Sequence, residues 1–274
     1  MSDPDLAAVT ADALAQIRAR HPLIHQITNY VVMNDTANVT LHIGASPVMA
    51  HALGEVREMV RHAGALVLNI GTLEPAWIDA MLAAGEEANE RGVPVILDPV
   101  GTGATTLRTE AAEEILTTLR IDVVRGNAAE LAAIAGLAAQ IRGVDAVSAE
   151  APDVAARIVA RRTGGAAVVS GPVDHVADAT RAAQIANGHP LMGAITGSGC
   201  MATALVGAFR AVVPDPFLAA ASAMVAFGVA GEIAAQRSAG PGTFRQHLMD
   251  AVYGLDGEVI RARARATVSE VPPA

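Results

Sequence analysis

The sequence contains no lysine, and this absence excludes two large classes of active site. A Walker-type nucleotide site needs a lysine on the β and γ phosphates, so the chain cannot bind ATP through that motif. Schiff-base enzymes need a lysine amine, so that covalent chemistry is excluded as well. Any phosphate group that this protein binds is therefore expected to be held by arginine side chains or by main-chain N–H groups.

Cysteine and aromatic residues are also scarce. The single cysteine cannot form an internal disulfide, and no signal-peptide pattern precedes the first apolar segment, so we expect a cytoplasmic protein. Aromatic residues make up 3% of a chain that is 52% hydrophobic, so the core must be built from Ala, Val, Leu and Ile. That composition suits helices packed closely on a parallel sheet. One apolar run, 216–235, is rich in alanine and carries Glu232, which favours a buried helix over a membrane span.

Basic residues are outnumbered, with 19 against 28 acidic ones, so the net charge is −9. A chain with this excess of acidic residues lacks the general positive charge that binds the phosphate backbone of nucleic acids. We therefore expect neither a nucleic-acid partner nor a membrane partner. The 274 residues carry evenly spread apolar segments and no linker-like composition, which predicts one domain over residues 1–274.

Short apolar runs alternate with longer helical patterns along the chain. Buried strands are predicted at residues 65–70, 94–98, 122–125 and 166–170. Helices are predicted at residues 75–91, 109–119 and 154–162. An antiparallel hairpin and three helical blocks follow at residues 174–177 with 182–186, and at 200–213, 216–236 and 243–265. This order predicts an α/β fold with a mostly parallel central sheet and helices on both of its faces.

Ligands of open α/β sheets bind at the carboxyl ends of the strands, so residues just after each predicted strand are candidates for the site. Asp98 ends one strand, and Asn127 and Glu130 follow the next. Two carboxylates and an amide in one crevice would suit a loosely held Mg²⁺, which prefers oxygen ligands. Alternatively, Asn127 and Glu130 form a helix capping box while Asp98 makes turn hydrogen bonds. The spacing of these residues leaves both interpretations open.

A glycine-rich turn, ITGSGC at residues 195–200, runs directly into an apolar helical segment. Gly197 and Gly199 let the backbone approach an anion closely, and the N-terminus of the helix binds negative charge without a cationic side chain. Arg125, directly after a predicted strand, could grip phosphate groups bidentately, or it could pair with a neighbouring carboxylate. The turn and the arginine together suggest a phosphate site of a type that needs no lysine.

Cys200 lies in the first turn of the helix that follows the glycine-rich turn. The helix dipole would favour its thiolate there, so Cys200 could act as a weak base or present a small polar surface to a substrate. A lone cysteine can equally be an inert core residue. Ser198 lies outside a GxSxG pattern and has no evident partners, so we do not expect a hydrolase nucleophile.

Six motifs follow one another along the chain. They are HQITNYV at 25–31 with GASPVM at 44–49, LNIGTL at 68–73, DPVGTGA at 98–104, RGNAAE at 125–130, TGSGC at 196–200 and GPGTF at 240–244. Together and in this order they resemble the hydroxyethylthiazole kinase family. The resemblance extends over most of the chain and leaves only the two ends unassigned.

The resemblance implies a ribokinase-like fold without a separate lid. It implies ATP- and Mg²⁺-dependent phosphorylation of the primary alcohol of 4-methyl-5-(2-hydroxyethyl)thiazole, in thiamine biosynthesis or salvage. A homotrimer with active sites between subunits is implied as well. Each of these properties is an expectation that depends on the resemblance.

The matching positions also imply roles for individual residues. Thiazole contacts are implied for Met49, Gly197 and Asn29, and ATP contacts for Arg125 and Ser170. Metal binding is implied for Asp98 and Glu130, with Asn127 beside them, and catalysis for Cys200, Gly197 and Gly199. Ser170 stands where the family more often has threonine, which keeps the hydroxyl. Cys200 stands where most ribokinase-like enzymes carry an aspartate base.

Two other functions fit parts of the sequence. A hydroxymethylpyrimidine-type kinase would share the fold and the glycine-rich turn, but it would be expected to carry an aspartate-like base at position 200. A catalytically silent nucleotide- or thiazole-binding protein would not need Asp98, Asn127, Glu130 and Arg125 together. Thiazole-dependent release of ADP distinguishes all three functions.

Overall fold

The computed structural model describes residues 5–137 and 151–271. Its centre is one nine-stranded sheet with the strand order β2-β1-β3-β4-β5-β6-β7-β8-β9. In chain order the strands are β1 (Leu23–Ile27), β2 (Ser46–Val48), β3 (Ala65–Asn69), β4 (Val95–Asp98), β5 (Val123–Asn127), β6 (Ala166–Ser170), β7 (Asp174–Ala177), β8 (Arg181–Ile185) and β9 (Ala266–Glu270). The strands from β2 to β6 are mutually parallel, whereas β7, β8 and β9 extend the sheet in antiparallel pairs.

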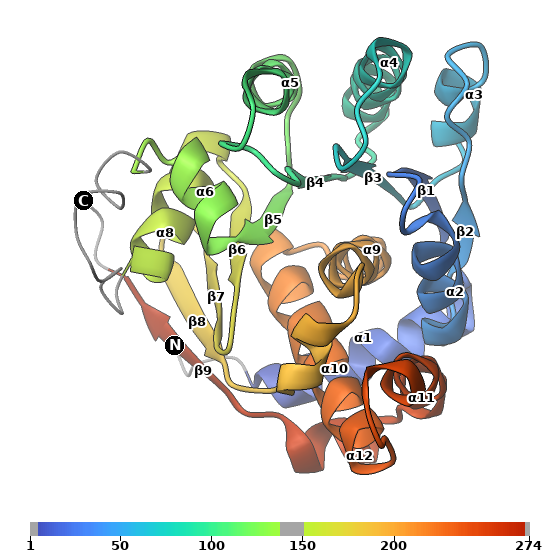
Figure 1. The fold of residues 1–274 in the computed structure, drawn as a ribbon, viewed down its shortest axis with the longest axis vertical. Helices are drawn as coiled ribbons and strands as arrows, with labels where there is room; N and C mark the ends of the chain where they lie inside the picture. Colours follow the sequence, from blue (N-terminus) through green and yellow to red (C-terminus); the bar gives the residue numbers. More distant parts are fainter. Residues whose placement is uncertain (1–4, 138–150, 272–274) are drawn as a thin grey trace.

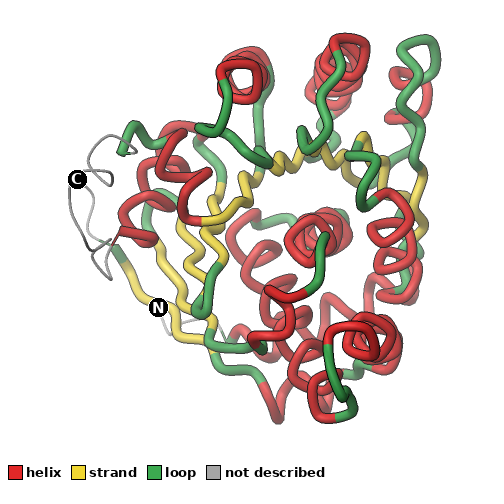
Figure 2. The backbone as a smooth tube through the Cα atoms, in the orientation of Figure 1, coloured by secondary structure: helices red, strands yellow, loops and turns green. Residues whose placement is uncertain are grey.

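Helices cover both faces of this sheet, which curves between them (Figures 1 and 2). One face carries α1 (Leu6–Arg20), α2 (Met33–Ile43), α9 (Ser198–Arg210), α10 (Pro216–Gln236), α11 (Pro241–Gly254) and α12 (Gly257–Arg263). The other face carries α3 (Val56–Val60), α4 (Pro75–Arg91), α5 (Thr106–Thr118), α6 (Ala128–Ile134) and α8 (Ala151–Thr163). A short 3₁₀ segment, η1 (Pro190–Ala194), leads towards α9. The predicted α/β class, with helices on both faces of a mostly parallel sheet, is confirmed.

Two hydrophobic cores fill the space between the sheet and its helices. Successive side chains of β3 alternate between them: Ala65 and Val67 pack with the α9–α10 side, and Leu66 and Leu68 pack with the α4–α5 side. This alternation is what a strand that is buried on both faces requires. It explains why the parallel strands are read in the sequence as continuous apolar runs.

Helix α10 crosses the first of these cores. It is long and apolar enough to span a membrane by length and composition, yet 83% of its most apolar window is buried inside the protein. Fifteen of its residues are buried, and Asp215 caps its N-terminus through the N–H of Leu218. The expectation of a buried helix is confirmed for this segment.

The prediction of one continuous helix over residues 243–265 is wrong. Helix α11 ends at Gly254, and α12 starts anew at Gly257, where the Asp256 side chain accepts a hydrogen bond from Val259 N–H at 2.8 Å. After Arg263 the chain turns into β9, which pairs with β8 from Ala266 to Glu270. The sequence analysis also did not identify β1 and β2, which together start the sheet.

Candidate active site

Six parallel strands end at the same edge of the sheet, and this edge carries most of the candidate residues. Met49 follows β2 and Asn29 lies two residues beyond β1. Asp98 ends β4, Asn127 ends β5 and Ser170 ends β6. Because the strand order is β2-β1-β3-β4-β5-β6, these residues follow one another along the edge. The thiazole candidates therefore lie towards β2 and the ATP candidates towards β6, with Asp98 between them.

Asp98 is almost fully buried and held by two side chains. Its Oδ2 accepts hydrogen bonds from Asn69 Nδ2 and from Thr203 Oγ1, each at 2.8 Å. Its Oδ1 has no hydrogen-bond partner among the described residues. Burial raises the pKa of Asp98 to about 6, although the nearby Arg125 charge opposes this shift. A buried carboxylate oxygen without a partner is costly, so this oxygen is available for a cation or a hydrogen-bond donor.

Cys200 lies on the other side of Asn69. Its sulfur accepts from Asn69 Nδ2 at 3.2 Å and from Asn29 Nδ2 at 3.6 Å. Burial, with the negative charge of Asp98 as the next cause, raises the pKa of the Cys200 thiol to about 12. The expectation that the helix dipole favours the thiolate is therefore wrong, because desolvation outweighs the dipole at this site. Cys200 is a protonated thiol at neutral pH, and it lies within the candidate site.

The glycine-rich turn gives α9 an open N-terminus. Gly197 occupies the N-cap position with φ = 83°, in the left-handed region, and no side chain caps the helix. A Cβ atom at Gly197 would lie 2.7 Å from Val32 Cγ1, and one at Gly199 would lie 2.5 Å from Arg125 Nη1. Gly197 is therefore required by the backbone geometry, whereas a side chain at Gly199 would have to displace the end of Arg125. Uncapped N–H groups at the positive end of a helix form a site for an anion.

Arg125 supplies a buried positive charge next to this helix terminus. Its Nη2 donates to Ser170 Oγ at 2.5 Å, and its Nε has no hydrogen-bond partner within the described part of the chain. No carboxylate of the described residues pairs with it within 4.0 Å, so the alternative of a plain ion pair is not realised. Arg125 as a whole residue is only 8% exposed. A buried charge without a counterion suits an anionic ligand.

A cavity of about 550 Å³ joins Arg125 to the N-terminus of α9. Its lining combines polar side chains, among them Arg125, Ser170, Asp174, Asn187, His189 and Ser198, with the apolar side chains of Met192, Met224 and Phe227. A nucleotide likewise combines charged phosphates with an apolar ring. The cavity has room for a ligand of that size.

Asn127 and Glu130 form the capping box that the sequence analysis kept as an alternative. Asn127 Oδ1 accepts from Glu130 N–H at 3.0 Å, and Glu130 Oε2 accepts from Asn127 N–H at 2.8 Å. The other oxygen of Glu130 accepts from Gly101 N–H at 2.8 Å. The described residues contain no cluster of three or more His, Cys, Asp or Glu side chains with metal-site geometry. Each Glu130 oxygen thus has one protein donor, and one further position on each remains open.

Met49 and Asn29 lie at the β2 and β1 end of the edge. Asn29 is 4% exposed and donates to Asn69 Oδ1 at 2.8 Å, which joins it to the Asp98 network. Met49 is partly exposed, and its carbonyl accepts from His51 Nδ1 at 3.1 Å. The next carbonyl, of Ala50, interacts with the buried His25 Nε2 at 2.7 Å. Met49 follows β2, whereas Gly197 immediately precedes α9, so the two thiazole candidates come from different segments of the fold.

Asn69 links Asn29, Asp98 and Cys200, and it is one of the strand-end residues that the sequence makes candidates for the site. Two further residues near the site were not identified from the sequence. Thr203 reaches Asp98 from one turn into α9, which no sequence signal indicates. Asp174 lines the cavity at the start of β7, in the hairpin that the sequence does predict.

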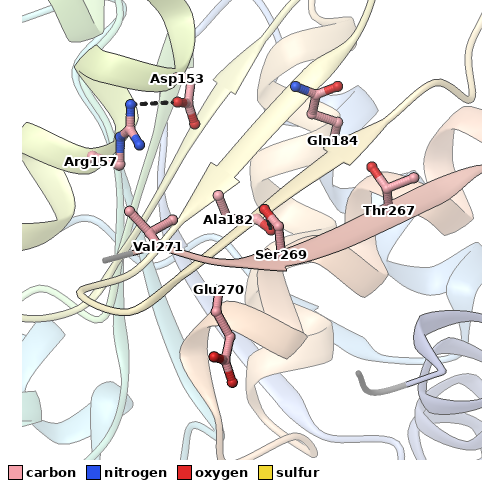
Figure 3. Close-up of a pocket in the computed structure, with 8 residues that line it drawn as sticks. All are labelled: Asp153, Arg157, Ala182, Gln184, Thr267, Ser269, Glu270 and Val271. Atoms are coloured by element: carbon pink, nitrogen blue, oxygen red, sulfur yellow. Dashed lines mark hydrogen bonds and ion pairs between the residues drawn. The ribbon is translucent and has the colours of Figure 1, made fainter. Parts of the chain in front are cut away.

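A second cavity, of about 300 Å³, lies away from this edge (Figure 3). It is lined by Asp153, Arg157, Ala182, Gln184, Thr267, Ser269, Glu270 and Val271. Arg157 and Asp153 form an ion pair with each other at 2.7 Å, so the one guanidinium drawn there is already neutralised. None of the candidate residues lines this cavity.

Comparison with known proteins identifies the family. A sequence profile of the hydroxyethylthiazole kinase family matches residues 14–258. The chain belongs to the hydroxyethylthiazole kinase family. It is 53% identical over 266 residues to the hydroxyethylthiazole kinase of Desulforudis audaxviator, with 97% of each chain covered. It is 50% identical over 256 residues to that of Chloroflexus aggregans, covering 93% of this chain and 92% of the relative.

Solved structures agree with this assignment. A hydroxyethylthiazole kinase structure from Pyrococcus horikoshii superposes with a TM-score of 0.87 and 45% identity, covering 96% of this chain and 99% of the other. The pyridoxal kinase of Staphylococcus aureus, in complex with AMP-PCP and pyridoxal, has a TM-score of 0.62 at 14% identity, and it shows a shared ribokinase-like fold alone. As a hydroxyethylthiazole kinase family member, the chain is a phosphotransferase that phosphorylates hydroxyethylthiazole. The resemblance in the sequence and the function that it implies are confirmed.

Proposed function

We propose that the chain binds ATP in the cavity between Arg125 and α10, and that it transfers the γ-phosphoryl group at the N-terminus of α9. One observation carries this proposal. Arg125 is buried, no carboxylate of the described residues pairs with it within 4.0 Å, and it lies against Gly199 in the uncapped first turn of α9. The Arg125 guanidinium and the N-terminus of α9, each able to bind an anion, thus lie next to each other in the wall of the cavity. Ser170 orients the Arg125 fork there.

We propose Mg²⁺ as the accompanying ion, bound at Asp98 with Glu130 and Asn127 beside it. The unpartnered Oδ1 of Asp98 and the open positions on Glu130 fit a hard cation that keeps most of its waters. When bound there, the ion would neutralise charge on the β and γ phosphates. The capping bonds of Glu130 and Asn127 favour contact through water for these two residues.

The proposed reaction forms a bond between the hydroxyethyl oxygen and the γ-phosphorus, and it breaks the bond from that phosphorus to the β–γ bridging oxygen. ADP leaves with the bond's electron pair. The transition state is loose, so positioning and charge stabilisation dominate and a strong base is not required. The alcohol loses its proton to the medium once its oxygen has begun to bond to phosphorus. The N–H groups at Gly197, Gly199 and Cys200 are proposed to stabilise the transferring group.

Cys200 is proposed to orient the acceptor alcohol as a neutral thiol. Its sulfur already accepts from Asn69 and Asn29, so its S–H remains free to donate to a substrate oxygen. We expect Cys200→Ala to lose less than about tenfold in kcat, since a neutral hydrogen bond contributes about 1 kcal/mol. Steady-state kinetics over a range of pH checks this. If Cys200→Ala were as inactive as a variant with a bulky side chain at Gly199, the thiol would have to be an essential base.

We propose that the thiazole binds at the β1–β2 end of the edge, where Asn29, Met49 and Gly197 are the contacts implied by the family motifs. The same motifs imply a site shared between subunits, and we propose that arrangement as well. Exposed apolar side chains gather on neighbouring segments and suit a subunit contact: Tyr30, Val31, Leu41 and Tyr253, each more than half exposed. We propose a homotrimer on this ground.

The wider setting is also proposed. One sheet runs through both described segments of the chain, which supports a single domain over residues 1–274. The single thiol, which is not in a disulfide, supports a reducing, cytoplasmic compartment. Phosphorylation of the thiazole alcohol would serve thiamine biosynthesis or salvage.

Release of ADP by the purified protein tests the proposed function. We expect turnover with ATP, Mg²⁺ and the thiazole alcohol, and little with hydroxymethylpyrimidine or with no acceptor. Preference for the pyrimidine would support the proposed ATP site but would mean that the acceptor is the pyrimidine alcohol.

Arg125→Gln should raise the KM for ATP strongly, while the affinity for the thiazole stays the same, because the substitution removes the charge from the proposed nucleotide site only.

A further inference from the structure

Asp174 is a buried carboxylate in the wall of the cavity proposed for ATP. It is 7% exposed and starts β7. The adjacent pair across the hairpin is Val169 with His175, so Asp174 lies opposite Ser170. Its neighbours in the cavity wall are therefore the residues that orient Arg125.

One oxygen of Asp174 has a structural role and the other does not. Oδ1 accepts from Gly171 N–H at 3.0 Å, which closes the turn between β6 and β7. Oδ2 makes no hydrogen bond with any described residue, and no arginine of the described segments pairs with the carboxylate within 4.0 Å. Asparagine would close the same turn without a buried charge. The charge of Asp174 is thus not explained by the turn.

The position of Asp174 limits which part of a nucleotide it can contact. Phosphate oxygens would repel a carboxylate, and Arg125 with the α9 terminus already serves them. The apolar side chains that η1 and α10 contribute to the cavity wall, Met192, Met224 and Phe227, suit the base. Asp174 lies close enough to Arg125 for the guanidinium charge to oppose the rise in the Asp174 pKa that burial causes. The part of ATP next to the phosphates that carries neutral donors is the ribose, with its two hydroxyl groups.

From this arrangement we infer that Asp174 accepts a hydrogen bond from a ribose hydroxyl of the bound nucleotide and so selects ribonucleotides over deoxyribonucleotides. The inference rests on the proposed ATP site in this cavity. Carboxylates accept ribose hydroxyls in other nucleotide folds because two hydroxyl donors match two acceptor oxygens. A charged acceptor makes that bond stronger than a neutral one. Binding of the sugar also gives Oδ2 a partner.

The test compares ATP with 2′-deoxy-ATP and 3′-deoxy-ATP on the wild type and on Asp174→Asn and Asp174→Ala. We expect the wild type to prefer ATP over at least one deoxynucleotide by about tenfold or more in kcat/KM, the range for a hydrogen bond to a charged group. Asp174→Ala should bring this ratio close to one by losing activity with ATP alone. Asp174→Asn keeps the acceptor for Gly171 N–H, so it should fold normally and still lose most of the discrimination.

Three outcomes would overturn the inference. The first is an unchanged ATP preference in both variants. The second is an equal loss with all three nucleotides that Asp174→Asn restores, because that pattern belongs to a turn that is only structural. The third concerns binding: calorimetry with ADP, 2′-deoxy-ADP and 3′-deoxy-ADP, without acceptor, shows whether the cavity takes a nucleotide at all. If none of the three binds, the proposed function fails together with the inference, whereas equal binding of all three refutes the inference alone.

Discussion

Gly199→Leu is expected to lower kcat/KM by at least about 10³-fold while the protein stays folded. A Cβ atom at this position would already lie 2.5 Å from Arg125 Nη1, and the rest of the leucine would fill the space at the start of α9. Removal of one donor to a developing anion costs on the order of 10²–10³ in kcat, and this substitution blocks the anion and displaces Arg125 together. Kinetics with ATP and the thiazole alcohol measures the effect.

The stability of the same variant separates chemistry from folding. Leucine favours a helix over glycine by about 1 kcal/mol, so the thermal midpoint of Gly199→Leu should not fall through helix propensity. Gly199→Ala is the graded control, because the end of the Arg125 side chain can shift by the small distance that one methyl group needs. We expect Ala to give an intermediate rate. If Gly199→Leu kept a rate within tenfold of the wild type, the transferring phosphoryl group would have to lie elsewhere.

Asp98→Asn is expected to have two opposite effects, a large loss of activity and a gain of stability at neutral pH. Activity should fall by at least about 100-fold, since the proposed metal at this carboxylate would supply several kcal/mol of charge stabilisation. The stability effect follows from the pKa of about 6, which burial raises above the 3.8 of an ordinary aspartate. The folded state then binds protons more tightly than the unfolded state.

The sign of the pH dependence is fixed by this shift. The contribution of Asp98 to stability is fully present below about pH 4 and is lost as the pH rises through about 6. An asparagine does not titrate, so the advantage of Asp98→Asn over the wild type should grow between pH 4 and pH 7, to on the order of 3 kcal/mol. Urea unfolding without Mg²⁺ at several pH values measures it.

Asp122→Asn is the matched control for this stability effect. Asp122 lies between β4 and β5 at the other end of the sheet, where it accepts from Arg210 at 2.7 Å and from Val95 N–H at 3.1 Å. Loss of that pair should lower stability rather than raise it, and it should leave the catalytic edge unchanged. A gain in stability for both variants, or for neither, would contradict the role assigned to the burial of Asp98.

The sequence predicts the middle of this fold better than its margins, for a physical reason. Strands β3 to β6 are buried on both faces, so they are continuous apolar runs with clear ends. Strand β1 carries buried polar side chains, His25 and Gln26, and β2 has three residues, one of them Pro47. Strand β9 is an edge strand of mostly exposed side chains, and its polar composition resembles the end of a helix. Tertiary contacts define these three strands, and local pattern does not.

The residues of the candidate site were likewise predicted only in part. Asp98, Ser170 and the glycine-rich turn could be found because they follow predicted elements directly. The protonation state of Cys200 could not, because it depends on burial beside Asp98, which lies about 100 residues away in the chain. The contact from Thr203 to Asp98 likewise depends on how α9 packs against the sheet. Spacing in a sequence indicates which residues share an edge, whereas their charges are set by their neighbours in space.

The order of strands along the catalytic edge has a consequence for how substrate specificity can change in this family. Neighbouring strands lie about 4.8 Å apart, so the sheet fixes the separation between the proposed nucleotide site at β6 and the proposed acceptor site at β2 in steps of that size. A bond to phosphorus forms over a much shorter range than one such step. An acceptor of different length therefore cannot be accommodated by moving its site to the next strand. The set of alcohols that the enzyme accepts should instead change through substitutions in the loops after β1 and β2, while the proposed nucleotide site at β6 stays the same.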